Sequence, residues 1–297
     1  MYKKMVVLLD GSELAEVVFH YAQELSGRLH IDVDLLHICR PQAVAQLPMC
    51  RAYVEQKAEE LCTKAEEVRA RYSKDAVQQC VVARGNVAVG YPAEEILKYI
   101  DDNDIDLVMM STHGSSGVKT WDLGEVANKV IHASRIPVWL VPTALREEII
   151  ADNLPARSLV VPLSGSKESS AAIPHAVSLI THRGEGELVL LHVVEMPTMS
   201  VTRETSEDVK RQRGEMKEYL EKLAQPIRES GVEVRTVVLV GSPAAQIINY
   251  LKANPTQLLA MATSRKGRLS RMVFGNVTEN IIHMVKVTPL LLVNGED

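Results

Sequence analysis

The sequence predicts an α/β protein built from two similar domains, each a doubly wound, five-stranded parallel sheet. Two observations carry this prediction. Short continuous apolar runs alternate with longer helical patterns, which is typical of strands that crossover helices bury on both faces. The same order of segments also occurs twice along the 297 residues, a length that fits two domains of ordinary size.

Two motifs recur at one offset and set the register of the halves. Gly90-Tyr91-Pro92-Ala93-Glu94-Glu95-Ile96 returns as Gly241-Ser242-Pro243-Ala244-Ala245-Gln246-Ile247, and Leu123-Gly124-Glu125-Val126 returns as Phe274-Gly275-Asn276-Val277. Turn and breaker residues gather between the copies. We therefore expect a first domain over residues 1–143, a linker over 144–156 and a second domain over 157–297.

The elements follow from the apolar runs and the helical patterns between them. The expected strands of the first half are Val6–Leu9, Val33–Ile38, Cys80–Ala83, Leu107–Met110 and Val138–Val141, with a helix over Ala52–Arg71. Those of the second half are Leu159–Leu163, Leu188–Val194, Val234–Val240, Leu258–Ala262 and Leu290–Val293. Its helices are expected near Lys167–His182, Glu204–Ser230, Pro243–Ala253 and Asn276–Val285.

Composition indicates an ordinary soluble protein, with 46% hydrophobic and 24% charged residues. A net charge of −5 argues against a nucleic-acid or membrane-surface partner, because a protein that binds either one needs a basic surface to attract its phosphates. The first apolar run meets Asp10 too soon for a signal peptide, and no run approaches membrane-spanning length. The four cysteines show no metal or redox spacing, so we expect reduced thiols and a cytoplasmic protein.

Polar residues and glycines follow the expected strands of the first half. Ligands of open parallel sheets bind beyond the carboxyl ends of the strands. Glycines let backbone amides approach an anion, a helix start offers unpaired N–H groups to phosphate, and an aspartate there accepts hydrogen bonds from ribose hydroxyls. The candidate ligand residues are Asp10, Gly11, Ser12, Ile38, Ser111, His113, Gly114, Gly117, Gly124 and Glu125.

Several of these segments together resemble the universal stress proteins. They are the strand ending in Asp10-Gly11-Ser12, Leu35-Leu36-His37-Ile38, Gly90 to Ile96, Ser111-Thr112-His113-Gly114 and Ile136 to Val141. The resemblance covers nearly the whole chain, once per half. It implies an adenine nucleotide alpha hydrolase-like fold, a pseudo-two-fold relation between the domains, and ATP or AMP, with Mg²⁺, in the first domain.

The family's nucleotide motif, Gly-x2-Gly-x9-Gly-(Ser/Thr), aligns here as Ser111-x2-Gly114-x9-Gly124-Glu125. Ser111 is a modest departure. Glu125 is a larger one, because a carboxylate at a helix start repels a triphosphate through like charge. Two alternatives stay open: Glu125 turns to solvent or cooperates with Mg²⁺, and nucleotide binds, or it is only a helix-stabilising acid.

In the second half the aligned positions are altered. Ser164 stands where the first half has Asp10, and Ala262 and Arg265 replace the first two motif glycines. The nearby residues Arg265, Lys266, Arg268, Arg271, Gly275 and Asn276 form a candidate anion site. The alternative is a solvated basic loop. Ser164 to Ser169 resembles the phosphate loop of ATP pyrophosphatases only weakly, and a simple helix start explains it as well.

Three functions compete. The first is a nucleotide-responsive regulatory protein of the stress response, the second a stress-linked scaffold that binds no nucleotide, and the third a slow ATP hydrolase. His113 lacks a paired nucleophile and carboxylate, and no metal-ligand spacing or nucleophile elbow occurs. We therefore expect a binding protein rather than a dedicated enzyme.

The last strand of each half is an apolar edge, and such edges tend to pair. Since the final strands meet in dimers of the family, the resemblance implies that Val138–Val141 faces Leu290–Val293 within one chain. A further homodimer and an unidentified protein partner are also consistent with the sequence.

Overall fold

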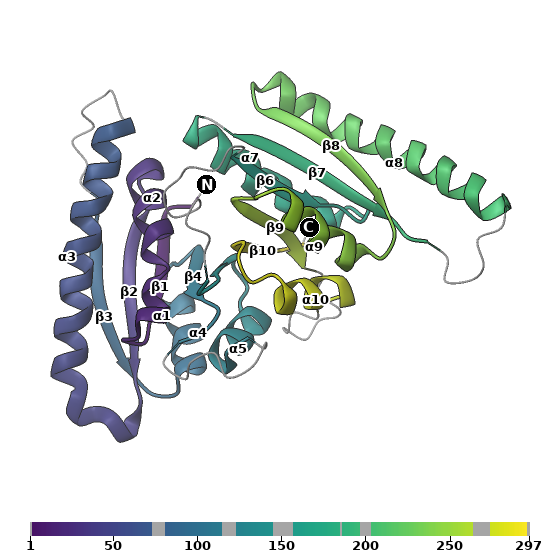
Figure 1. Cartoon of the computed structure of the whole chain (residues 1–297). Coiled ribbons are helices and arrows are strands. Elements are labelled where there is room, and N and C mark those ends of the chain that lie inside the picture. Colours follow the sequence, from purple (N-terminus) through teal and green to yellow (C-terminus); the bar gives the residue numbers. More distant parts are fainter. Residues whose placement is uncertain are drawn as a thin grey trace. The chain divides into compact units, whose positions relative to one another are not determined.

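The computed structural model describes residues 2–72, 81–114, 123–144, 157–184, 186–196, 203–263 and 274–295 (Figure 1). The chain divides into two compact units, and the boundary along the sequence falls between residues 144 and 157. Both units are α/β with parallel strands, which confirms the predicted fold class.

The first unit is a five-stranded parallel sheet in the order β3-β2-β1-β4-β5. Its strands are β1 (Lys4–Leu9), β2 (Asp32–Cys39), β3 (Ala83–Val89), β4 (Leu107–Ser111) and β5 (Val138–Val141). Its helices are α1 (Glu13–Glu16), α2 (Phe19–Leu29), the 3₁₀ helix η1 (Pro41–Gln46), α3 (Leu47–Tyr72), α4 (Pro92–Asp102) and α5 (Glu125–Ala133).

The second unit repeats this topology as β8-β7-β6-β9-β10. Its strands are β6 (Ser158–Pro162), β7 (Glu187–Val194), β8 (Glu233–Val240), β9 (Leu258–Thr263) and β10 (Leu290–Asn294). Its helices are η2 (Glu168–Ala171), α7 (Ala172–Arg183), α8 (Arg203–Glu229), α9 (Pro243–Ala253) and α10 (Asn276–Met284). Figure 1 shows α8 lying along β7 and β8, which it contacts.

The strand order creates a switch point in each sheet. From β1 the chain moves outward to β2 and β3, then returns to place β4 on the other side of β1. Because such crossovers are right-handed, this reversal puts α2 and α3 on one face and α4 and α5 on the other. Helices within each of these pairs are in contact. The connections that leave the carboxyl ends of β1 and β4 therefore run to opposite faces of the sheet and leave room for a ligand.

The third strand of the first half corrects the sequence prediction. We expected Cys80–Ala83, whereas β3 runs over Ala83–Val89, and Cys80 lies outside the described residues. β3 is a half-exposed end strand, so no continuous apolar run marks it. A side chain on Gly85 would meet the backbone of Val54 2.7 Å away, because α3 approaches the strand closely there.

The strands β5 and β10 match their predicted positions, β10 with one more residue at its carboxyl end. Each ends the strand order of its own unit. The pairing of Val138–Val141 with Leu290–Val293 stays a prediction. In the described part of the chain, no helix is long and apolar enough to cross a membrane.

His175 in α7 is expected to make the stability of the chain depend on pH. Burial lowers its pKa from 6.5 to about 4. Between these values the unfolded chain binds the proton and the folded chain does not, so the free energy of unfolding falls as the pH drops from 6.5 to about 4. Because His175 is partly exposed, we expect a loss of about 1–2 kcal/mol.

Urea denaturation of the His175→Gln variant at pH 7 and at pH 4.5 measures this effect. The variant should show a smaller difference between the two pH values than the parent chain. His182→Gln, which changes an exposed histidine of the same helix, is the control and should keep the parental difference. An unaltered pH difference in His175→Gln would contradict the assignment.

Candidate functional site

A cavity of about 420 Å³ lies in the first unit at the carboxyl ends of β1, β2 and β4. This volume is within the usual range for small-molecule sites. It is lined by seven of the predicted ligand residues, Asp10, Ile38, Ser111, His113, Gly114, Gly124 and Glu125. Gly11 and Ser12 shape the turn beside it, and Gly117 lies outside the described residues. We call this cavity the first cleft.

The turn after β1 holds the carboxylate of Asp10 in place. Gly11 has a φ of 81°, a left-handed conformation that favours glycine, and it turns the chain back so that Ser12 faces Asp10. The Ser12 hydroxyl donates to Asp10 Oδ1 at 2.6 Å, and the Ser12 N–H donates to the same oxygen at 3.1 Å. Ser12 also caps α1, accepting from the N–H of Ala15. Asp10 itself stays exposed at the cleft.

Gly114 lies directly against Asp10. A side chain at position 114 would overlap the Asp10 carboxylate, so the close approach of the two segments requires glycine. Gly124 closes the other side of this turn, and its N–H donates to the Thr112 carbonyl at 3.0 Å. An added carbon on Gly124 would lie 3.2 Å from that same oxygen. The glycines predicted at 114 and 124 are therefore both backbone-approach positions.

Ser111 and His113 stabilise the turn that carries Gly114 through hydrogen bonds. The buried Ser111 hydroxyl donates to the His113 carbonyl, and His113 Nδ1 lies 3.1 Å from the Thr112 hydroxyl. These contacts orient the backbone of the loop. They make both residues supports of the cleft as well as part of its lining.

Glu125 opens α5 with its side chain 80% exposed and paired with Lys129, whose Nζ lies 2.7 Å from Oε1. The Lys129 hydrogen bond and charge, and more weakly the charge of Arg40, lower the pKa of Glu125. Its neighbour Gly124 provides no side-chain cap for the helix. The first-turn N–H groups of α5 therefore have no capping side chain, and the nearest carboxylate is partly neutralised by Lys129.

Sequence reasoning missed other residues that line the first cleft. Among them are Cys39 at the end of β2, Arg40 directly after it, Cys50 in α3, and Pro92 at the start of α4. Arg40 brings a positive charge to the cleft, and its signal was available, since it follows the predicted second strand by two residues. The sequence also allows Glu125 to pair with Lys129, because Lys129 stands four residues later in the same helix.

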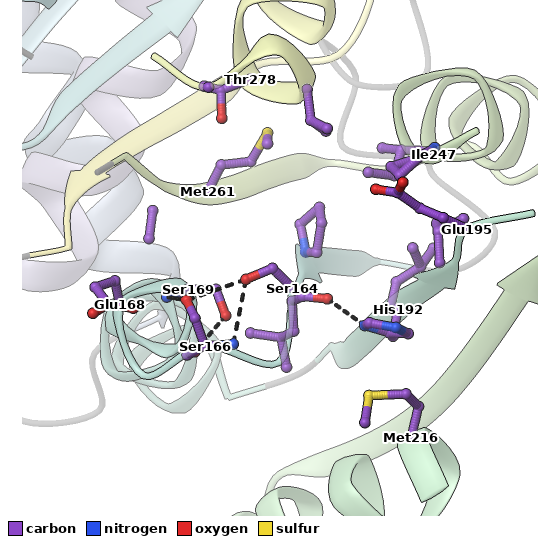
Figure 2. A pocket seen from close by; sticks show the side chains of 18 of the residues that line it. Ser164, Ser166, Glu168, Ser169, His192, Glu195, Met216, Ile247, Met261 and Thr278 are labelled. Carbon is purple, nitrogen blue, oxygen red and sulfur yellow. Dashed lines mark hydrogen bonds between the residues drawn. The ribbon is translucent and has the colours of Figure 1, made fainter. Parts of the chain in front are cut away.

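The second unit has a larger cavity, of about 1050 Å³, at the carboxyl ends of β6, β7 and β9 (Figure 2). We call it the second cleft. Gly275 lines it, whereas Asn276 is the exposed first residue of α10 and is not among the lining residues. The basic residues of the predicted anion site, Arg265, Lys266, Arg268 and Arg271, lie outside the described residues.

A serine turn replaces the Asp10 turn of the first unit. The Ser164 hydroxyl donates to Ser166 Oγ at 3.2 Å, and Ser166 Oγ also accepts from the N–H of Ser169 at 3.3 Å (Figure 2). Gly165 has a φ of 92°, a left-handed conformation like that of Gly11 in the first unit. The turn is therefore kept while its carboxylate is lost.

Among the described residues, no group of three or more histidine, cysteine, aspartate or glutamate side chains is placed to hold a metal ion. The described cysteines, Cys39, Cys50 and Cys62, form no disulfide with one another.

A doubly wound parallel sheet with a glycine-lined cleft at its switch point defines a class of small α/β ligand-binding domains, present here twice. The model of the universal stress protein family matches residues 1–142 and 155–294. The chain therefore belongs to the universal stress protein family, in a tandem form.

Individual relatives agree with this assignment. Universal stress protein YxiE of Bacillus subtilis is 26% identical over 147 residues, which are 48% of this chain and 99% of YxiE. Universal stress protein MJ0531 of Methanocaldococcus jannaschii is 30% identical over 147 residues, 50% of this chain and 86% of that protein. A crystal structure of a universal stress protein from Archaeoglobus fulgidus covers 99% of this chain and 98% of its own, with 21% identity and a TM-score of 0.64, and shows the shared fold.

Proposed function

We propose that the chain is a nucleotide-responsive regulatory protein of the stress response, and that its first cleft binds ATP or AMP. One observation carries the proposal: the Asp10 carboxylate and the backbone of Gly114 meet at the switch point, with no side chain between them. This pairing provides a fixed acceptor for ribose hydroxyls beside a backbone that an anion can approach closely.

The start of α5 supports the same proposal. The phosphates would lie toward Gly114, Gly124 and the uncapped first turn of α5, where backbone N–H groups and the helix dipole favour negative charge. Arg40 adds a cation to the lining. Mg²⁺ would enter with the triphosphate, screening its charge.

The charge of Glu125 does not oppose nucleotide binding as strongly as its position in the motif suggests. Its carboxylate is turned toward Lys129 and solvent, and ion pairing there offsets part of its charge. Of the two alternatives for Glu125, this geometry supports the one in which the cleft still accepts a triphosphate. We propose binding without a dedicated catalytic activity, with slow ATP hydrolysis as the competing function.

Isothermal titration of the full chain with ATP and AMP, with and without Mg²⁺, tests the proposal. We expect saturable heat for one site per chain. An absence of heat at millimolar ATP would favour the scaffold without nucleotide. Phosphate release is followed in the same samples, and release clearly above that of a Gly114→Arg variant would favour the hydrolase.

The Glu125→Ser variant is expected to bind ATP more tightly than the parent chain. The change removes an anion next to the proposed phosphate position and adds a hydroxyl donor, so we expect a gain of about 3- to 10-fold for ATP and less for AMP, which carries fewer charges. Titration calorimetry at low salt measures the gain. Glu279→Ser, the same change in the first turn of α10 in the other unit, is the control. Weaker ATP binding in Glu125→Ser would mean that the carboxylate helps the ligand, for example through Mg²⁺.

A further inference from the structure

Two buried polar residues line the second cleft and keep hydrogen-bonding capacity that the described residues do not satisfy. The first is His192, at the end of β7 and 9% exposed. Its Nδ1 lies 2.7 Å from the Leu163 carbonyl (Figure 2). Since a carbonyl only accepts, Nδ1 carries the proton of the neutral ring and Nε2 is left with a lone pair. No described residue bonds Nε2, so the cleft presents a hydrogen-bond acceptor.

The second buried group is Thr278 on α10, which is 8% exposed and lines the same cleft. Figure 2 shows its hydroxyl directed toward the space between the labelled side chains. Within the described part of the chain this hydroxyl has no hydrogen-bond partner. The aligned residue of the first unit is Ala127, so the second cleft gains a polar group that the first lacks. The hydroxyl oxygen is open to the cleft, where a ligand or water can bond it.

Among the described residues, the charged side chains that line the second cleft are acidic. Glu195 follows β7 at the position where Arg40 follows β2, so the charge at this point is reversed between the units. Exposed Glu168 and Glu215 also line the cleft. The backbone of Glu168 and the Ser166 hydroxyl bond the Glu168 carboxylate and lower its pKa.

The walls between these groups are apolar. Met216 of α8, Met261 of β9 and Ile247 of α9 face the cleft from three sides (Figure 2). A ligand that fits must therefore pair an apolar body with polar groups at its ends.

From these observations we propose that the second cleft is a separate binding site for a small organic amine with an apolar body. A hydroxyl or N–H of the ligand would donate to His192 Nε2 and bond Thr278, and its ammonium group would face Glu195 and the other rim glutamates. This site goes beyond the nucleotide function proposed for the first cleft and does not depend on it. Binding of an anion, through the basic residues predicted between Thr263 and Phe274, is the outcome that would replace it.

Three probes of one shape but different charge test the proposal: tyramine, 4-ethylphenol and 4-hydroxyphenylacetate. Each is titrated into the full chain and followed by calorimetry and by saturation-transfer NMR. We expect tyramine to bind about threefold or more tightly than neutral 4-ethylphenol, and the anion to bind most weakly. Equal binding of all three, no binding of tyramine, or preference for the anion would overturn the proposal.

Two variants copy residues from the chain's own first unit. Thr278→Ala restores the residue found at Ala127, and Glu195→Arg restores the charge of Arg40. We expect each to weaken tyramine binding about threefold to tenfold. Thr181→Ala on α7 and Glu229→Arg on α8 are the matched controls and should bind tyramine like the parent chain.

Two further measurements keep the result unambiguous. Thermal melting shows whether each variant is folded, and because Glu195 is exposed, Glu195→Arg is expected to fold even if Thr278→Ala does not. Gly114→Arg, which fills the first cleft, should leave tyramine binding unchanged. Loss of tyramine binding in Gly114→Arg, or unchanged binding in folded Glu195→Arg, would place the amine elsewhere and overturn the proposal.

Discussion

Replacing Gly114 with arginine is expected to abolish ATP binding by the first cleft. Any side chain at this position overlaps the Asp10 carboxylate, which Ser12 holds from the other side. Arginine would in addition fill the space proposed for the phosphates. We expect the affinity for ATP to fall about 100-fold or more, measured by titration calorimetry. The second half carries arginine at the aligned position, Arg265, where Ser164 replaces Asp10.

A matched control separates a filled cleft from a general effect of the added side chain. Gly214 is an exposed glycine within α8, and a carbon added there meets no atom within 4 Å. Gly214→Arg makes the same chemical change and should bind ATP like the parent chain. If Gly114→Arg is folded, as judged by thermal melting, and still binds ATP at the parental affinity, the nucleotide does not lie between Asp10 and Gly114.

Removing the carboxylate of Asp34 is expected to be among the most destabilising single changes in the first unit. Asp34 lies in β2 with only 3% of its surface exposed. It pairs with Lys4 Nζ at 2.7 Å and accepts from the Tyr99 hydroxyl at 2.8 Å. Burial and this hydrogen bond raise the pKa of Tyr99, so the phenol stays protonated and donates. Asp34→Ala should lower the free energy of unfolding by about 2–4 kcal/mol, because the Lys4 charge loses its partner.

Urea denaturation of Asp34→Ala, followed by circular dichroism, measures this loss. Asp101→Ala changes an exposed aspartate on α4 and is expected to shift stability by less than about 0.5 kcal/mol. A loss in Asp34→Ala no larger than in the control would show that the attraction between Asp34 and Lys4 barely exceeds the free energy needed to desolvate their charges.

The sequence is enough to predict most of the fold where strands are buried on both faces. Runs such as Val33–Ile38 and Leu188–Val194 mark β2 and β7 closely, because covered parallel strands are continuously apolar. The strand β3 escapes this signal. Its residues contain Arg84, Gly85 and Asn86, and its position is determined by pairing with β2 and packing against α3 rather than by its own composition.

The position of the first cleft can also be predicted from the sequence, because it follows from the topology of the sheet. A parallel sheet brings the carboxyl ends of its strands to one edge, so Asp10, Ser111 and Gly114 had to lie near one another. The direction of a side chain is a different matter. The exposure of Glu125 and its pairing with Lys129 depend on the rotamer it takes at the start of α5, which the motif spacing does not specify.

The second cleft shows the limit of reasoning from lost motifs. Comparing the halves identifies what Ser164 and Ala262 have removed, and it suggests a degenerate site. The cavity is nevertheless the larger of the two described, and its buried Thr278 and His192 depend on how α10 and β7 pack around it. A motif defined for nucleotide binding does not include positions such as Thr278 and His192, so comparing motifs does not detect them.

The division of the chain into two units has an evolutionary consequence. All described residues that line the first cleft come from the first unit, and all those that line the second come from the second unit. A substitution that changes what one cleft accepts therefore leaves the lining of the other intact. A duplicated chain of this kind can keep one specificity in one copy while the other copy changes, and the opposite charges of Glu195 and Arg40 are one difference between the two copies.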